Sequence, residues 1–355
     1  MRLIPTPLPL LLAAGLVGGI LQAQQTPLSG PVVAYAFDAP TASFRAILGW
    51  LGSSSLGPAL LPGIEFGSVA PRRNDGIAVR NGKGLVVAGL GTDRASTVEL
   101  AGAFSLPEGA AWADDGSAVA LYSRTGNWIQ IVRGFPDAPQ ADSPLSVSPL
   151  GGSIVVAALS PRAERTVLGI VGETSGVFEL TASQNFVPLL ALLKPVSLAF
   201  SGDGGTLFAL DRERREVSAL NWQDRTAQVW PVTGLADPVA LRAVPDHALP
   251  NPGPDQVLYV ASRADRLLVA FDLSSHQPIA TLELGFEPAG IEPLGRDSYT
   301  LAARLREGDP LWSFVNTPSL VNTPSLVNGL SFVNSPAPAV YFIPATPLLS
   351  TGGLQ

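Results

Sequence analysis

The stretch that decides the fold runs from residue 195 to residue 211 and reads PVSLAFSGDGGTLFALD. Two apolar, β-prone runs flank Asp203 and Gly204, a residue pair typical of the tight turn in a β-hairpin. Two further short runs follow, over residues 216–222 and 226–232. We name the four runs a, b, c and d. Together they predict a small antiparallel sheet with four strands.

The same order of runs recurs along the sequence. Successive a runs start about 40 to 50 residues apart, which is the spacing of blades in a β-propeller. The a runs start at Phe66, Gly109, Ile154, Pro195, Val239 and Gly290. A four-stranded sheet cannot bury both of its apolar faces alone, so such sheets pack face to face around an axis. The sequence therefore predicts an all-β propeller with about six four-stranded blades.

The two ends of the repeat region are incomplete. Residues 32–38 (VVAYAFD) and 44–48 (FRAIL) form a pair of β-prone runs with no a or b run before them. The last copy has an a and a b run, but its c run is displaced. We expect the N-terminal strand or pair to complete the last blade and so tie the two ends of the repeat region together. The alternative is an incomplete seventh blade.

Residues 207–220 (LFALDRERREVSAL), with FSGDG at 200–204 before them, resemble the blade consensus of the YVTN-type and NHL-type bacterial propellers. The likeness covers most of residues 32–345 as architecture, and only the copy that starts at Pro195 matches closely. Such motifs specify turns and packing rather than ligands. The resemblance implies a scaffold that is used for binding more often than for catalysis.

The N-terminus has the pattern of a secretory signal peptide. Arg2 precedes an apolar run over residues 8–21, and a small residue, Ala23, marks the expected cleavage point. The predicted organisation is a signal peptide over 1–23, a linker over 24–31, a propeller over 32–345 and a flexible tail over 346–355. No later stretch is long and apolar enough to span a membrane. We therefore expect a secreted or periplasmic protein.

A shorter repeat, with a period of six residues, begins near Val315 and reads VNTPSL, VNTPSL, VNGLSF, VNSP. Pro318 and Pro324 prevent a regular strand ladder, so we interpret residues 313–338 as a loop insertion ahead of a final strand over 339–343. Exposed apolar β-prone segments also seek partners. Self-association of the protein through residues 313–338 is therefore an alternative role for this segment.

Composition excludes several classes of function. The formal charge is −7, with 22 basic and 29 acidic residues, whereas a nucleic-acid-binding domain is normally basic. The sequence has no cysteine, which removes thiol catalysis and disulfides. Its only histidines, His247 and His276, lie among turn residues, where we expect solvated side chains. Asp114, Asp115 and Asp203 occupy hairpin turns, so no cofactor and no metal site are predicted.

Blade topology places the b–c connections, together with the d–a connections, on one face of the ring. Five of the six b–c connections contain arginine. Arginine's planar fork matches carboxylate, sulfate and phosphate groups, so this face is a candidate for binding an anion. Acidic neighbours, among them Glu213, Glu216, Asp265 and Glu307, would cancel part of that field. The candidate binding residues are Arg80, Lys83, Arg124, Arg212, Arg214, Arg215, Arg263, Arg266, Arg304 and Arg306.

We favour a secreted, non-catalytic propeller that binds a protein or an extracellular polymer, anionic in particular, through the face that carries the b–c and d–a connections. One alternative is a propeller hydrolase or lactonase with a carboxylate-bound divalent cation, because such cations need only oxygen ligands. Another is a self-assembling extracellular structural protein. Stoichiometric metal in the purified protein would favour the hydrolase.

Overall fold

A computed structural model describes residues 31–49, 54–103, 106–244, 257–295, 298–301, 311–315 and 339–343. The predicted signal peptide over 1–23, most of the linker, the tail over 346–355 and the period-six residues 316–338 lie outside the described residues. Within the described part the protein is almost entirely strand, with one short 3-10 turn, η1 (Ser148–Leu150). No helix there is long and apolar enough to cross a lipid bilayer.

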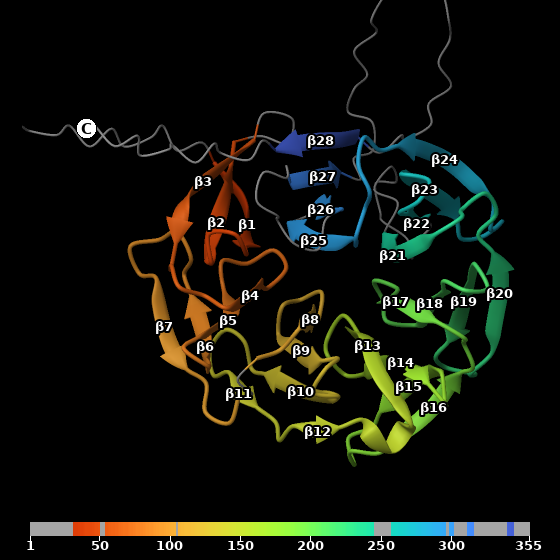
Figure 1. Cartoon of the computed structure of the whole chain (residues 1–355), viewed down its shortest axis with the longest axis horizontal. Helices are drawn as coiled ribbons and strands as arrows, with labels where there is room; N and C mark the ends of the chain where they lie inside the picture. The colour runs from red at the N-terminus through yellow and green to blue at the C-terminus, as the bar shows by residue number, and fades with distance from the viewer. Residues whose placement is uncertain are drawn as a thin grey trace, which may run out of the picture.

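The described residues form seven antiparallel sheets that stand side by side in a ring, and we number them as blades 1 to 7 in sequence order (Figure 1). Blade 1 consists of β1 (Val32–Asp38), β2 (Ser43–Leu48) and β3 (Ser55–Leu60). Blade 2 consists of β4 (Phe66–Val69), β5 (Gly76–Arg80), β6 (Lys83–Ala88) and β7 (Ser96–Glu99). Blade 3 consists of β8 (Gly109–Trp112), β9 (Ala118–Ser123), β10 (Trp128–Arg133), β11 (Gln140–Ala141) and β12 (Leu145–Ser146). Blade 4 consists of β13 (Gly152–Leu159), β14 (Thr166–Gly172), β15 (Gly176–Leu180) and β16 (Phe186–Leu190). Blade 5 consists of β17 (Pro195–Phe200), β18 (Thr206–Asp211), β19 (Glu216–Asn221) and β20 (Ala227–Pro231). Blade 6 consists of β21 (Pro238–Val244), β22 (Val257–Ser262), β23 (Leu267–Asp272) and β24 (Pro278–Glu283). Blade 7 consists of β25 (Glu292–Gly295), β26 (Ser298–Thr300), β27 (Leu311–Val315) and β28 (Ala339–Ile343).

The predicted all-β propeller is confirmed. Each of the six repeat copies forms one complete blade, with its a run as the first strand and the other runs following in order. The turn in the decisive stretch is also as predicted. Gly204 has a φ of 73°, and the Asp203 carboxylate accepts hydrogen bonds from the Gly205 N–H (2.8 Å) and the Ser201 hydroxyl (2.6 Å).

The N-terminal strands close the ring, as expected, but they do so as a separate sheet. β1 and β2 pair with each other and with β3, and they do not join the last blade. Blade 7 takes its outer strand from its own copy, because β28 pairs with β27. The three-stranded sheet lies between blades 7 and 2, as the alternative of an incomplete seventh blade requires. We missed β3 because Gly57 and Pro58, two poor strand formers, lie inside it.

Two boundaries near the C-terminus can now be placed. The final strand expected over 339–343 is present as β28. The loop insertion, expected to begin at residue 313, begins later, because β27 continues to Val315 and pairs with β28 along its length. Ladder pairing with β28 thus extends into the first period-six residue.

Among the described residues, seven hydrophobic clusters hold the ring together, and each lies between two neighbouring blades. Blades 5 and 6 share a cluster that includes Leu210, Val260 and Phe271. Blades 7 and 1 share a smaller one that contains Ile47 and Leu294. Small residues in the first strands of blades 4, 5 and 6, namely Ala157, Ala158, Ala199 and Ala240, are all buried. Each blade therefore buries its apolar faces only against its neighbours.

We expect Leu210→Ala to lower the free energy of unfolding by about 2–5 kcal/mol, because its fully buried side chain fills the junction of blades 5 and 6. The matched control is Val229→Ala on the exposed edge of β20, which should change stability by less than about 0.5 kcal/mol. Denaturant unfolding followed by circular dichroism measures both. Equal losses in the two variants would contradict the packing described here.

Candidate functional site

The predicted binding residues do gather on one face of the ring. Every complete blade is an antiparallel meander, so its b–c hairpin and the d–a connections lie at the same end of its strands. We call this end the b–c/d–a face. Arg304 and Arg306 lie outside the described residues. The eight that the structure describes are Arg80, Lys83, Arg124, Arg212, Arg214, Arg215, Arg263 and Arg266.

Four of these eight cations are neutralised by ion pairs. Lys83 Nζ lies 2.8 Å from Glu99, and Arg212 Nε lies 2.5 Å from Asp237. Arg214 and Arg266 make longer pairs, at 4.0 Å to Asp211 and 3.9 Å to Glu287. The carboxylates differ from the sequence neighbours that we expected to cancel the charge. Glu99 lies at the start of a d–a connection, and Asp237 and Glu287 lie within such connections. The sequence alone does not show that these connections lie beside the b–c hairpins.

The other four cations are Arg80, Arg124, Arg215 and Arg263. Within the part of the protein that the structure describes, no carboxylate lies within 4.0 Å of their guanidinium groups. They come from blades 2, 3, 5 and 6, and Arg124 and Arg215 are exposed. We call these four residues the unpaired rim. Of the four, Arg215 also acts on Asp265, whose carboxyl pKa is lowered first by the Ser262 hydrogen bond and in smaller part by the Arg215 charge. Outside that interaction, the donor groups of the rim can bind an anionic ligand.

Buried or half-buried carboxylates fix the backbone that carries this rim. Asp211 is fully buried and accepts hydrogen bonds from the backbone N–H groups of Leu193 (2.7 Å) and Glu213 (3.0 Å). It thereby ties the connection before blade 5 to the b–c hairpin of that blade. Asp265 does the same in blade 6, binding the Ser262 hydroxyl and the Ala236 N–H, and these bonds lower the pKa of its carboxyl. The hairpins that present the arginines are therefore held in place.

A second group of charged residues lies at the centre of the ring and was missed from the sequence. Arg242 on β21 forms an ion pair with Asp114, in the β8–β9 turn of blade 3. Its guanidinium carbon lies 6.0 Å from the ring centroid of Tyr299 on β26, and among the described residues its buried Nε has no hydrogen-bond partner. Because β8 and β21 are the innermost strands of their blades, this ion pair links two sides of the ring.

Glu292 on β25 belongs to the same central group. Glu292 is exposed, yet the protein around its carboxylate desolvates that group. That desolvation raises the pKa of Glu292 to about 7, although the positive charge of Arg242 acts in the opposite direction. A charged residue inside the apolar run 239–244 was the one sequence signal for this group. Its partners are too distant in the sequence to be inferred.

The turn residues that could have held a cation have other roles. Asp115 accepts a hydrogen bond from the Ser117 N–H (2.9 Å) beside Gly116, so the turn interpretation holds for that residue. Asp114 instead pairs with Arg242, which already supplies a positive charge. Across the described residues, no three His, Asp or Glu side chains gather as a metal site would require.

One of the two histidines, His276, is less exposed to solvent than we expected. His276, expected to be solvated, is half-buried and stacks on the indole of Trp230, with ring centroids 4.0 Å apart and planes 5° apart. It covers a tryptophan that packs between blades 5 and 6. His247 lies outside the described residues.

We found no protein-family model and no curated protein that matches this sequence. Solved structures do match. Hsv2 from Kluyvelomyces marxianus superposes with a TM-score of 0.53 and 13% identity, over 82% of this protein and 94% of that one. One subunit of a mitotic checkpoint complex superposes with a TM-score of 0.51 and 11% identity, over 98% and 90% respectively. The protein has a β-propeller fold. At these identities the likeness shows the propeller alone, and the resemblance to YVTN-type and NHL-type propellers stays a resemblance.

We expect the stability of the propeller to fall as pH rises from about 4.5 to about 7 through Glu292. Its folded pKa lies above the ordinary value of 4.5, so the folded state holds the proton more tightly over that interval. Glu292→Gln should therefore raise the melting temperature, relative to the wild type, more at pH 8 than at pH 5. Glu283→Gln, at an exposed position on β24, is the control. A gain for Glu292→Gln that is the same at both pH values would contradict this assignment.

Proposed function

We propose that this protein is a secreted or periplasmic, non-catalytic propeller that binds a protein or an extracellular polymer through its b–c/d–a face. The observation that carries the proposal is the unpaired rim of Arg80, Arg124, Arg215 and Arg263. These guanidinium groups lie on the hairpins of four blades, in a protein whose net charge is negative. The signal-peptide pattern at residues 1–23 supports export.

The chemistry of the rim favours a ligand with several anionic groups. Arginine presents a rigid planar set of donors that matches carboxylate, sulfate and phosphate oxygens. Four such groups around a ring suit a polymer or a protein surface better than a single small ion. The partner then gains from several weak contacts made together.

Rigidity of the rim supports the same conclusion. The carboxylates of Asp211 and Asp265 hold hairpins of blades 5 and 6 against the neighbouring connections. Binding to pre-ordered hairpins loses less conformational entropy than binding to mobile loops, so each arginine contact contributes more of its energy to affinity.

The test compares two quadruple variants that carry the same charge change. In the first, Arg80, Arg124, Arg215 and Arg263 are replaced by glutamine; in the second, the ion-paired Lys83, Arg212, Arg214 and Arg266 are replaced. Heparin, a sulfated polysaccharide, serves as the polyanionic probe, and affinity is measured by surface plasmon resonance. We expect the first variant to lose about tenfold or more in affinity, equivalent to about 1.4 kcal/mol. The second should lose markedly less.

Two results would overturn the proposed anionic ligand. One is a wild-type protein that binds neither heparin nor poly-glutamate at physiological salt. The other is an equal loss in both variants, which would reflect net charge rather than the unpaired rim. Circular dichroism of both variants checks that each keeps the propeller fold.

A further inference from the structure

A small hollow opens between blades 3 and 4, where the outer strand of blade 3 is divided. β11 and β12 both pair with β10, and the residues between them, Asp142 to Pro144, lie outside both strands, although the Asp142 N–H still donates to the Ile131 carbonyl (2.8 Å). The buried side chain of Gln130 donates to the carbonyl of Gly102 (2.8 Å) and to that of Asp142 (2.9 Å), which fixes this break. The division of the strand is thus a built feature of the blade.

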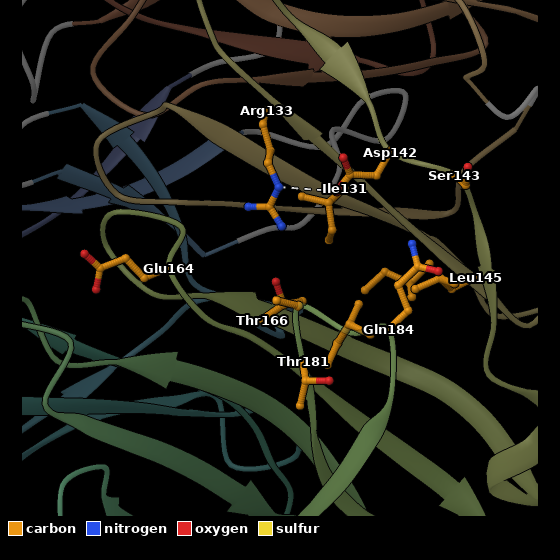
Figure 2. A pocket seen from close by; sticks show the side chains of 12 residues that line it. Ile131, Arg133, Asp142, Ser143, Leu145, Glu164, Thr166, Thr181 and Gln184 are labelled. Carbon is orange, nitrogen blue, oxygen red and sulfur yellow. Dashed lines mark hydrogen bonds and ion pairs between the residues drawn. The ribbon is translucent and has the colours of Figure 1, made fainter.

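The hollow has an apolar floor and a polar rim. Ile129, Ile131, Leu145 and Leu180 supply the apolar atoms, and Thr166 and Gln184 contribute polar groups. Figure 2 shows the Arg133 guanidinium next to Asp142, and these two groups neutralise each other at 3.3 Å. The volume is about 120 Å³, enough for about four waters or one aliphatic side chain.

A second, larger hollow lies on the other side of the β13–β14 turn, between blades 4 and 5. Its volume is about 320 Å³, and its walls are the turn over residues 160–165 and the glycine-rich turn over 202–205. Arg162 is exposed here, and the described part of the protein places no carboxylate within 4.0 Å of it. Asp203, the acidic residue opposite, already binds the Ser201 hydroxyl and the Gly205 N–H.

The other arginine in this hollow, Arg165, is held in a fixed orientation. Its Nη1 donates to the Gly204 carbonyl at 2.6 Å, and its guanidinium carbon lies 4.7 Å from the centroid of the Trp222 ring. Contact with an aromatic face and a backbone acceptor leaves the remaining N–H donors of Arg165 pre-oriented. Arg162 and Arg165 thus supply N–H donors to a hollow whose lining also includes the acidic residues Glu164 and Asp203.

The two hollows belong to one surface, which we call the two-hollow surface. Glu164 lines both of them, and Arg133 Nη1 donates to the Ala163 carbonyl at 3.1 Å, so the turn between the hollows is tied to blade 3. In Figure 2 the carboxylate of Glu164 points away from the first hollow. Because a–b turns lie at the opposite end of the strands from b–c hairpins, this surface is separate from the b–c/d–a face.

We propose that the two-hollow surface binds an extended peptide segment of a partner protein. One aliphatic side chain of the segment fills the first hollow, and a nearby carboxylate, from Asp, Glu or the peptide's own C-terminus, is bound by Arg162 and Arg165 in the second. The volume and apolar floor of the first hollow select the aliphatic group. The arginine N–H donors of the second, with Arg165 held in place by Gly204 and Trp222, select the acid, since a carboxylate accepts paired N–H donors from arginine. The inference does not depend on the proposed function, which concerns the other face.

The test is selection from a phage-displayed library of random linear peptides on the full-length protein, followed by fluorescence anisotropy with the most enriched peptide. We expect enriched sequences to pair Leu, Ile, Val or Met with Asp or Glu within a few positions. Ala182→Phe, at an exposed residue that lines the first hollow, and Arg162→Glu, in the second, should each weaken binding by about tenfold or more. Arg94→Glu, an exposed charge reversal in blade 2, should change it by less than about twofold.

Three results would overturn the proposal. The first is a selection that enriches no peptide, or peptides without the aliphatic and acidic pair. The second is binding that Ala182→Phe and Arg162→Glu leave unchanged. The third is binding of an oligo-uronate, in place of any peptide, with the same dependence on Arg162, which would make the ligand a saccharide. Because Ala182 and Arg162 are both exposed, we expect their replacement to leave the fold intact. Melting curves of the variants check this.

Discussion

Each complete sheet in this protein has two apolar faces, and neither face can be buried within the sheet itself. Strand β18 illustrates the constraint. Leu207 and Ala209 pack into the cluster shared with blade 4, whereas Phe208 and Leu210, which alternate with them, pack into the cluster shared with blade 6. Successive side chains of a strand point to opposite faces, so a strand buried on both faces becomes an unbroken apolar run. Closing the sheets into a ring gives every face a neighbour.

The same constraint leaves the two ends of the strands free for chemistry. Turns and connections lie there, and their sequences are limited by turn geometry and hydrogen bonding rather than by packing. At one end, carboxylates such as Asp211 bind backbone N–H groups and set the positions of the arginine hairpins. At the other end, the β13–β14 turn separates a hollow with an apolar floor from one that contains the N–H donors of two arginines. The ring is thus a common support for two surfaces of different character.

Local patterns in the sequence predicted what local forces determine. The a–b hairpin at 195–211, the succession of complete blades and the face that carries the b–c arginines all follow from turn residues and alternation within about 20 residues. Long-range features were not accessible in that way. The ion pair between Arg242 and Asp114 joins residues 128 apart, and the partner of Arg212 is Asp237 on a different connection. β3 was missed for a local reason, because its Gly57 and Pro58 contradict strand propensity while packing between blades 7 and 2 overrides it.

The claim that the ring is held by contacts between neighbouring blades is tested most directly at the junction where its two ends meet. Ile47 is fully buried there, between blades 1 and 7. In a protein with Trp50 and Trp312 replaced by phenylalanine, the remaining tryptophans in strands or their adjoining turns report on blades 3 and 5, away from that junction. Unfolding of Ile47→Asp in denaturant is then followed by tryptophan fluorescence and by circular dichroism. Closure of one ring predicts that both midpoints fall together. A fluorescence midpoint that stays at the value of the parent protein would contradict it.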